Sequence, residues 1–212
     1  MSGLVYYIID TETTGLSPKY HEVNEVSIIR CSDRVQLTEF IKCDYPERAN
    51  FDALAITKKT LADLANGNDK EYVVNKMNTF LNEDGLTPSH RCFVAHNWSF
   101  DKKFIHALYE KVNQKCPVDL WLCTMAMTKS YAKQIGLVKP KVNLHAACDI
   151  VGIKKISTAH ASKVDSRNTY LLYRNLVDER KVDYLPLIKT DVHTYSAPVD
   201  DGEGLDLSLL DE

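Results

Sequence analysis

The hydrophobic pattern of the chain opens with an unbroken apolar run at residues 4–9. The run is short for a globular helix and rich in β-branched and aromatic residues, which is typical of a strand buried on both faces at the centre of a sheet. Asp10, Thr11 and Glu12 follow directly. Because strand side chains two positions apart point the same way, we expect both carboxylates to leave one face at the carboxyl end of this strand.

Later apolar runs predict further strands and helices. Residues 23–29 and 35–41 indicate strands joined by a short polar link, so the first three strands are expected to form an antiparallel meander. Residues 92–95 predict a fourth strand. Helical spacing of apolar residues predicts helices at about 56–64, 73–81, 99–113, 120–131, 144–151 and 161–179. A meander followed by strands that alternate with helices predicts an α/β fold, with a mixed sheet of antiparallel and parallel strands flanked by helices.

The chain of 212 residues divides by composition into a body and a tail. We expect one domain at residues 1–182 and an acidic, extended tail at 183–212, where the hydrophobic pattern fades. Residues 200–212 carry six of the 29 acidic residues and no Lys or Arg, so the remainder has 23 acidic and 26 basic residues. A body with a formal charge of about +3 permits a polyanionic partner without requiring one.

Composition also limits the cellular compartments in which the protein is expected. Six cysteines, none in a CxxC pair, favour a reducing compartment over a zinc site or a disulfide framework. No apolar run is long enough to span a bilayer, and the N-terminus lacks the pattern of a signal peptide. We therefore expect no membrane contact and a cytoplasmic location, associated with the nucleoid or with replication if the host is bacterial or a phage.

The carboxylate pair after the first strand is the first candidate for chemistry. Two like charges this close repel each other, and a divalent cation such as Mg²⁺, which prefers oxygen ligands, removes the conflict. Open α/β sheets bind their ligands outside the carboxyl ends of the strands. The alternative is that Asp10 and Glu12 face water at a turn, as the following Thr13, Thr14 and Gly15 indicate.

Two further carboxylates head helices that should pack on the sheet. Asp101 lies on the apolar stripe of its predicted helix, where an unpaired charge is costly, although the first turn of a helix also favours a negative charge. Asp165 shares a helix face with Asn168 and two leucines, and His160 precedes it by five positions on the expected entry loop. Each feature alone has a structural explanation. Together, four carboxylates at strand ends and helix starts predict one site.

The order of these residues resembles the DEDDh family of 3′→5′ exonucleases. The similarity spans residues 4–178 and rests on the DTETTGL, VAHNxxFD and H-x4-D segments. Members include the epsilon-type proofreading subunit of bacterial DNA polymerase III, ribonuclease T, oligoribonuclease and exonuclease X, to which WLCTM at 121–125 is also similar. The chain departs at LAIT, residues 54–57, where many members have His-Gly-Ile-Thr. Because no carboxylate is involved, we expect that departure to be peripheral.

The resemblance implies a ribonuclease H-like fold and hydrolysis with two Mg²⁺ or Mn²⁺ ions, which clamp the attacking and leaving oxygens of a phosphodiester. It implies that Asp10 bridges the ions and that Glu12 and Asp165 hold the ion that activates water. Asp101 would support the second ion. His160 would orient the attacking water and accept its proton, a role suited to an imidazole with a pKa near about 6.5.

The resemblance also implies contacts to the substrate, a nucleic acid with a free 3′ end. Thr11, Thr13 and Leu16 are expected to contact the terminal nucleotide, with Leu16 wedged against its base. Asn97 and Phe100 are expected to line the opposite wall. Packing under the turn is the alternative role for Leu16, and core packing rather than base stacking is the alternative for Phe100. The lysines considered for phosphate contacts are Lys102, Lys103, Lys154, Lys155 and Lys163.

The acidic C-terminal segment carries alternating leucines, which gain little from burial without a partner. Leu205 to Leu210 resembles a bacterial sliding-clamp-binding peptide of the form Gln-Leu-Ser-Leu-Phe, with the first and last positions replaced. Contact with a clamp or replisome is one hypothesis for this segment. Docking of the leucines on the protein's own surface is the alternative.

These features predict a 3′→5′ exonuclease that acts on DNA and releases nucleoside 5′-monophosphates, in proofreading, replication or repair. An RNA-trimming member of the same family would carry the same carboxylates, because recognition of 2′-hydroxyl groups is not readable from these residues. A non-catalytic nucleic-acid-binding module is disfavoured by the presence of all five site residues. An ATP-dependent phosphotransferase is disfavoured by the lack of a Gly-rich phosphate loop.

Overall fold

The computed structural model describes residues 3–156 and 161–195, which contain a six-stranded sheet in the order β3-β2-β1-β4-β5-β6. The strands are β1 (Val5–Thr13), β2 (Val23–Arg30), β3 (Gln36–Phe40), β4 (Arg91–Ala95), β5 (Leu120–Cys123) and β6 (Lys189–Thr190). β1, β2 and β3 pair antiparallel in sequence order, whereas β1, β4 and β5 are parallel neighbours and β6 is antiparallel to β5. The predicted mixed sheet with an antiparallel meander is confirmed.

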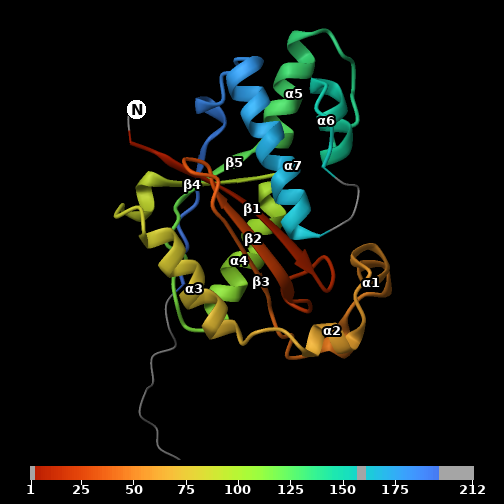
Figure 1. Cartoon of the computed structure of the whole chain (residues 1–212), viewed down its shortest axis with the longest axis vertical. Helices are drawn as coiled ribbons and strands as arrows, with labels where there is room; N and C mark the ends of the chain where they lie inside the picture. The colour runs from red at the N-terminus through yellow and green to blue at the C-terminus, as the bar shows by residue number, and fades with distance from the viewer. Residues whose placement is uncertain (1–2, 157–160, 196–212) are drawn as a thin grey trace, which may run out of the picture.

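The α-helices of the described residues are α1 (Phe51–Thr57), α2 (Leu61–Ala65), α3 (Lys70–Asn82), α4 (Trp98–Lys111), α5 (Thr124–Gln134), α6 (Leu144–Val151) and α7 (Ser162–Arg174). Helices α3 and α4 pack on one face of the sheet and α5, α6 and α7 on the other, whereas α1 and α2 lie beside it (Figure 1). None of the helices in the described part of the chain combines the length and the apolar character that crossing a membrane requires.

Alternation along β1 assigns its side chains to two cores. Tyr7 and Ile9 belong to the core formed with α3 and α4, whereas Ile8 belongs to the core formed with α5, α6 and α7. All three are 0% exposed. β1 is therefore buried on both faces, as its apolar run predicts, and its carboxyl end is held from both sides.

The prediction of a helix at residues 120–131 is wrong for its first four residues. Leu120–Cys123 forms β5, and α5 begins at Thr124. Trp121 pairs in register with Phe93 of β4, and their ring centroids lie 5.1 Å apart. A short apolar run does not distinguish a buried strand from a buried helix. The open edge beside β4 decides in favour of the strand.

Residues 183–195, which composition assigns to the tail, fold back on the domain. β6 pairs with β5, and the backbone N–H of Asp191 donates to the carbonyl oxygen of Asp119 at 2.8 Å. His193 is 3% exposed and its ring stacks on His106 with 4.3 Å between centroids. This segment is held by backbone hydrogen bonds and a stacked imidazole rather than by regularly spaced apolar side chains. The hydrophobic pattern of the sequence therefore gives no sign that residues 183–195 pack on the domain. Leu205 to Leu210 lies outside the described residues.

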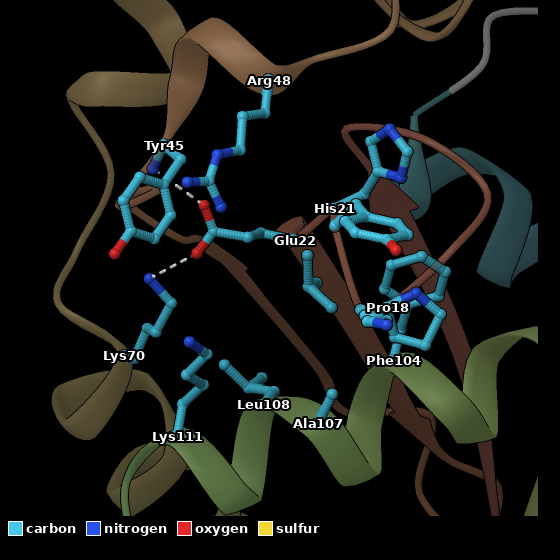
Figure 2. Close-up of a pocket in the computed structure, with 13 residues that line it drawn as sticks. Pro18, His21, Glu22, Tyr45, Arg48, Lys70, Phe104, Ala107, Leu108 and Lys111 are labelled. Carbon is cyan, nitrogen blue, oxygen red and sulfur yellow. Dashed lines mark hydrogen bonds and ion pairs between the residues drawn. The ribbon is translucent and has the colours of Figure 1, made fainter.

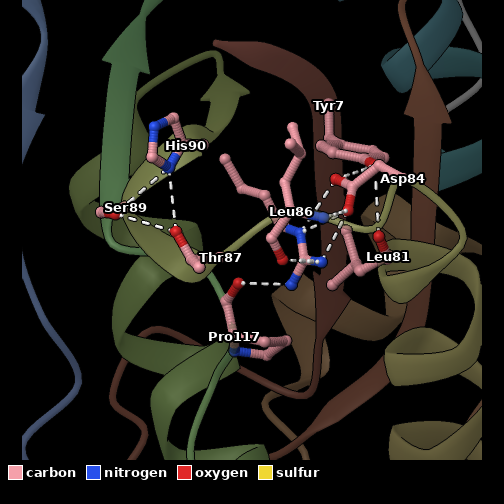
Figure 3. A network of polar contacts seen from close by, with 9 residues as sticks. Tyr7, Leu81, Asp84, Leu86, Thr87, Ser89, His90 and Pro117 are labelled. Carbon is pink, nitrogen blue, oxygen red and sulfur yellow. Dashed lines mark hydrogen bonds and ion pairs between the residues drawn. The ribbon is translucent and has the colours of Figure 1, made fainter. Parts of the chain in front are cut away.

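A buried ion pair closes the end of the sheet where β1 and β4 begin (Figure 3). Arg91, 2% exposed, donates through Nε and Nη2 to the carboxylate of Asp84 at 2.9 and 2.6 Å. The hydroxyl of Tyr7 donates to the same carboxylate at 2.8 Å. Burial opposes ionisation of Asp84, but the hydrogen bonds from Arg91, the Leu86 N–H and Tyr7 together outweigh it and lower the pKa of Asp84. This network stabilises the end of the sheet opposite to Asp10 and Glu12.

Candidate active site

Asp10 and Glu12 lie at the carboxyl end of β1 on the side of α7. They share the parity of Ile8, whose side chain enters the core under α5, α6 and α7. Asp165 occupies the first turn of α7 and is 8% exposed. One carboxylate oxygen from each of Asp10, Glu12 and Asp165 lies within 4.8 Å of the others. The fold therefore brings together three of the carboxylates that the sequence singles out.

Asp101 approaches the same strand from its other face. It lies 4% exposed in the first turn of α4. The backbone N–H and the hydroxyl of Thr11 donate to its Oδ1 at 3.1 and 2.9 Å. Asp101 is not one of the three carboxylates grouped within 4.8 Å. The expected group of four is thus a cluster of three with a fourth carboxylate held beside it by Thr11.

Burial and mutual repulsion oppose ionisation of these groups. Burial, followed by the charges of Asp101, Glu12 and Asp165, raises the pKa of Asp10. Burial and then the charge of Asp165 raise the pKa of Glu12 to about 7, and burial raises the pKa of Asp101 to about 7. A bound cation reverses this balance. Clustered carboxylate oxygens with raised pKa values fit a hard divalent ion.

A buried network of polar contacts lies behind the carboxylate cluster, and it was not predicted from the sequence. Glu25 of β2 pairs with Glu12 across the antiparallel ladder and is 3% exposed. Lys59 Nζ, between α1 and α2, and Ser162 Oγ, at the start of α7, each donate to the Glu25 carboxylate at 2.8 Å. Ser162 stands three positions before Asp165. A carboxylate inside the apolar run of the second strand is the signal that could have revealed this network.

A pocket of about 290 Å³ adjoins the carboxylates and includes Thr11, Glu12, Thr13, Leu16 and Phe100 in its lining. Leu16 is 83% exposed, so packing under the turn does not occur. Phe100 lines the pocket, and the centroid of its ring lies 5.0 Å from that of Phe104.

Two expectations about this pocket need correction, and one falls outside the structure. Asn97 is exposed at the start of α4 and does not line this pocket. Ile56 and Thr57 do line it. The LAIT departure is therefore not peripheral, because α1 forms a wall of the pocket. His160 lies outside the described residues.

Comparison with known proteins decides the family. A family model for exonucleases, RNase_T, matches residues 7–173. The chain belongs to this exonuclease family. The resemblance to the DEDDh exonucleases is confirmed, and hydrolytic exonuclease chemistry is the activity of the family.

The curated proteins similar to this chain include PolC-type DNA polymerases III. The DNA polymerase III PolC-type of Staphylococcus haemolyticus is 23% identical over 177 residues, which cover 83% of this chain and 12% of that protein. This chain thus spans only a small part of the curated relatives it matches.

Solved structures confirm the ribonuclease H-like fold. The nuclease domain of 3′hExo, a DEDDh family member bound to rAMP, has a TM-score of 0.67 at 16% identity, covering 85% of this chain and 96% of that one. E. coli exonuclease I in complex with a dT13 oligonucleotide has a TM-score of 0.66 at 16% identity, covering 85% of this chain and 43% of that one.

Proposed function

We propose that this exonuclease removes nucleotides from the 3′ end of nucleic acid with divalent metal ions and releases nucleoside 5′-monophosphates. One observation carries the proposal: the oxygens of Asp10, Glu12 and Asp165 lie within 4.8 Å of one another, and Glu12 also lines a pocket of about 290 Å³. That volume is close to the lower end of the range for small-molecule sites, so the pocket suits one terminal nucleotide.

The carboxylates would hold two ions, Mg²⁺ or Mn²⁺, which when bound lower the pKa of the attacking water and stabilise charge on the leaving oxygen. Asp10 would be a ligand shared by both ions, and Glu12 and Asp165 would hold the ion on the water side. Asp101, whose Oδ1 is engaged by Thr11, would support the ion on the leaving-group side. His160 remains the proposed base that orients the attacking water and takes its proton.

The turn after β1 would position the terminal nucleotide. The Thr13 hydroxyl donates to the carbonyl oxygen of Gly15 at 2.7 Å, which supports the turn immediately before exposed Leu16. Leu16 would wedge against the terminal base, with Phe100 on the opposite wall and the backbone of Thr11 and Thr13 beside the sugar.

DNA is the favoured substrate because PolC-type DNA polymerase III relatives match most of this chain. A role in proofreading, replication or repair accords with that likeness. RNA trimming is the second candidate, because the fold is shared with a DEDDh nuclease domain bound to rAMP. Contact with a sliding clamp or replisome through Leu205 to Leu210 stays a prediction. It fails if the full chain and a chain that ends at Val199 capture a clamp equally well.

The test is digestion of matched 5′-labelled DNA and RNA oligomers, with and without EDTA. We expect a ladder that shortens from the 3′ end and stops when EDTA is present. Asp10→Asn should lower the rate by about a thousandfold or more, because it weakens the ligand shared by both ions. Exposed Glu71 on α3 supplies the control, and Glu71→Gln should digest at the parental rate. Parental digestion by a folded Asp10→Asn protein would overturn the proposal.

A further inference from the structure

We infer that a second pocket, of about 60 Å³ and beside the candidate active site, binds a phosphate of the strand upstream of the 3′-terminal nucleotide, while the bases of that strand stack on exposed rings at its rim. We call it the upstream pocket and define it by Lys19, Tyr20, Tyr45, Arg48 and Lys111, all of which line it. The inference rests on the proposed exonuclease function and extends it, because it identifies where a polymeric substrate is held.

The upstream pocket is continuous in sequence with the pocket at the carboxylates. The turn between β1 and β2 supplies Gly15 and Leu16 to one pocket and Pro18 and Lys19 to the other. Three residues span at most about 11 Å, so Leu16 and Lys19 are at most that far apart along the backbone. A strand with about 3.4 Å per nucleotide covers this distance in a few nucleotides.

Three segments from different parts of the fold surround the upstream pocket: the turn between β1 and β2, the loop before α1, and α4. Figure 2 shows Lys111 on α4 facing the loop that carries Tyr45 and Arg48, with Glu22 between them. Gly15 makes this arrangement possible, because a Cβ at that position would lie 2.3 Å from the ring of His21, another lining residue. The turn therefore packs its backbone against one wall of the pocket.

The charge of the upstream pocket suits a polyanion. Four cationic side chains and one carboxylate, Glu22, line it, which gives a formal charge of +3. Lys70 is compensated, with its Nζ 3.0 Å from Glu22 and 2.7 Å from Asp44. Within the described ranges, the other three cations, Lys19, Arg48 and Lys111, form no ion pair. Uncompensated cations that converge on one concave surface attract phosphate groups.

Aromatic rings beside these cations favour a nucleic acid over an acidic peptide. Tyr20 is 57% exposed and Tyr45 is 43% exposed. The guanidinium carbon of Arg48 lies 3.9 Å from the ring centroid of Tyr45, and Lys19 Nζ lies 5.2 Å from that of Tyr20. Exposed rings interleaved with cations are the combination that binds single strands, because bases stack while phosphates are neutralised.

The lysines that the sequence suggests for phosphate contacts include two that are engaged elsewhere. Lys102 pairs with Asp191, and Lys155 pairs with Asp149. Lys111 has no such partner among the described residues and projects from the last turn of α4 into the upstream pocket. Ion pairs thus occupy Lys102 and Lys155, and the upstream pocket adds Lys19, Arg48 and Lys111 as candidates for phosphate contacts.

The experiment compares two substrates of different length. Thymidine 5′-(4-nitrophenyl phosphate) reaches only the carboxylate cluster and the pocket beside it, whereas oligothymidylate also reaches the upstream pocket. Lys111→Ala should lower kcat/KM for the oligomer relative to the ester by about fivefold at low salt. The change should appear in KM, and the slope of log KM against log salt should flatten by about 0.7, the value for one phosphate of a single strand. Lys111→Arg should restore both quantities.

Two further variants sharpen the comparison. Glu22→Gln removes the one carboxylate of the pocket and keeps an oxygen that can accept from the Tyr45 N–H, so it should lower KM for the oligomer. Exposed Lys133 at the end of α5 is the matched control. Lys133→Ala loses the same charge on a helix that packs in the other core, and it should leave the ratio of the two substrates unchanged.

Each outcome bears on one of the two proposals. An unchanged ratio for Lys111→Ala, or an equal fall for Lys133→Ala, overturns the upstream pocket while leaving exonuclease activity established. A parent protein that hydrolyses neither substrate overturns the exonuclease proposal. In that case anisotropy of a labelled oligothymidylate in EDTA still tests the pocket, because Lys111→Ala must bind more weakly than Lys133→Ala for the inference to stand.

Discussion

At the scale of single residues, the carboxylates of the candidate site repel one another. Burial and neighbouring charges raise the pKa of Asp10 and bring the pKa of Glu12 to about 7. Such a group stabilises the folded state below its unfolded pKa, and this contribution is lost as the pH rises through the folded pKa. The metal-free protein should therefore lose stability from these groups between about pH 4 and pH 7.

Asp10→Asn should raise the Tm of the metal-free protein at pH 8 by a few degrees, because it removes one of the repelling charges. The gain should shrink towards pH 4, where the parental carboxylates are protonated. Thermal denaturation in EDTA at both pH values measures it. Half-buried His96, whose pKa is lowered to about 4 by loss of contact with water, acts in the opposite direction but is common to both proteins.

Addition of Mn²⁺ at pH 8 supplies the control for that comparison. The parent should gain more Tm than Asp10→Asn, since the ion offsets the repulsion that the variant has already lost. A variant that is less stable than the parent at pH 8 in EDTA would contradict this account of the site.

At the scale of elements, α7 delivers Asp165 to a strand end because its first turn is tied to β2. Ser162 and Ser166, both 0% exposed, lie one turn apart on this helix. Ser162 Oγ donates to Glu25, opposite Glu12, whereas Ser166 Oγ donates to Ser27 Oγ at 3.0 Å, and Ser27 lies opposite Asp10. The two serines thus tie the same helix to the same strand, each beside a different carboxylate of the site.

Ser162→Ala should weaken Mn²⁺ binding by about tenfold, as is usual when the support of a metal ligand is removed. Thr128→Val on α5, which loses a buried hydroxyl that donates to the carbonyl oxygen of Thr124 at 2.8 Å, should leave the affinity for Mn²⁺ unchanged. Each variant loses a buried hydrogen bond and should destabilise the fold by about 1–2 kcal/mol. Calorimetric titration of Mn²⁺, with denaturant unfolding alongside, separates the two effects. Equal Mn²⁺ affinities in the two variants would show that Ser162 has no positioning role.

At the scale of the whole molecule, the segment after Val182 completes the sheet edge. β6 covers the side of β5 that β4 does not, and an uncovered edge strand is prone to pair with other chains. The Cys116 N–H donates to Nδ1 of His193 at 3.1 Å, and the other ring nitrogen contacts Glu110 Oε1 at 3.2 Å. These contacts join the segment to α4 and to the loop before β5.

A chain that ends at Val182 should therefore have a lower Tm than a chain that ends at Tyr195, and it should aggregate more readily. Thermal denaturation and light scattering measure the two properties. His193→Ala in the longer chain should account for part of the loss in Tm, because it removes the stacked ring and its hydrogen bonds. Equal Tm values for the two chains would mean that residues 183–195 contribute nothing to the fold.

The sequence by itself determined what depends on local periodicity. The apolar run before Asp10 makes β1 a central strand, and period-two alternation puts Asp10 and Glu12 on one side of it, as the structure confirms. The spacing of apolar residues sets most of the helices. The motif order then indicates the exonuclease family, which the family match confirms. Each of these conclusions uses residues that are near neighbours along the chain.

Only the tertiary structure decided which distant groups meet. Leu120–Cys123 is a strand because β4 offers it an edge, Thr11 holds Asp101, and Glu25 lies opposite Glu12. The cations of the upstream pocket converge from a turn, a loop and a helix. These contacts join segments that are far apart in the sequence and share no periodicity. Burial, charge compensation and hydrogen bonding between such segments therefore depend on how the chain folds and cannot be read from local sequence.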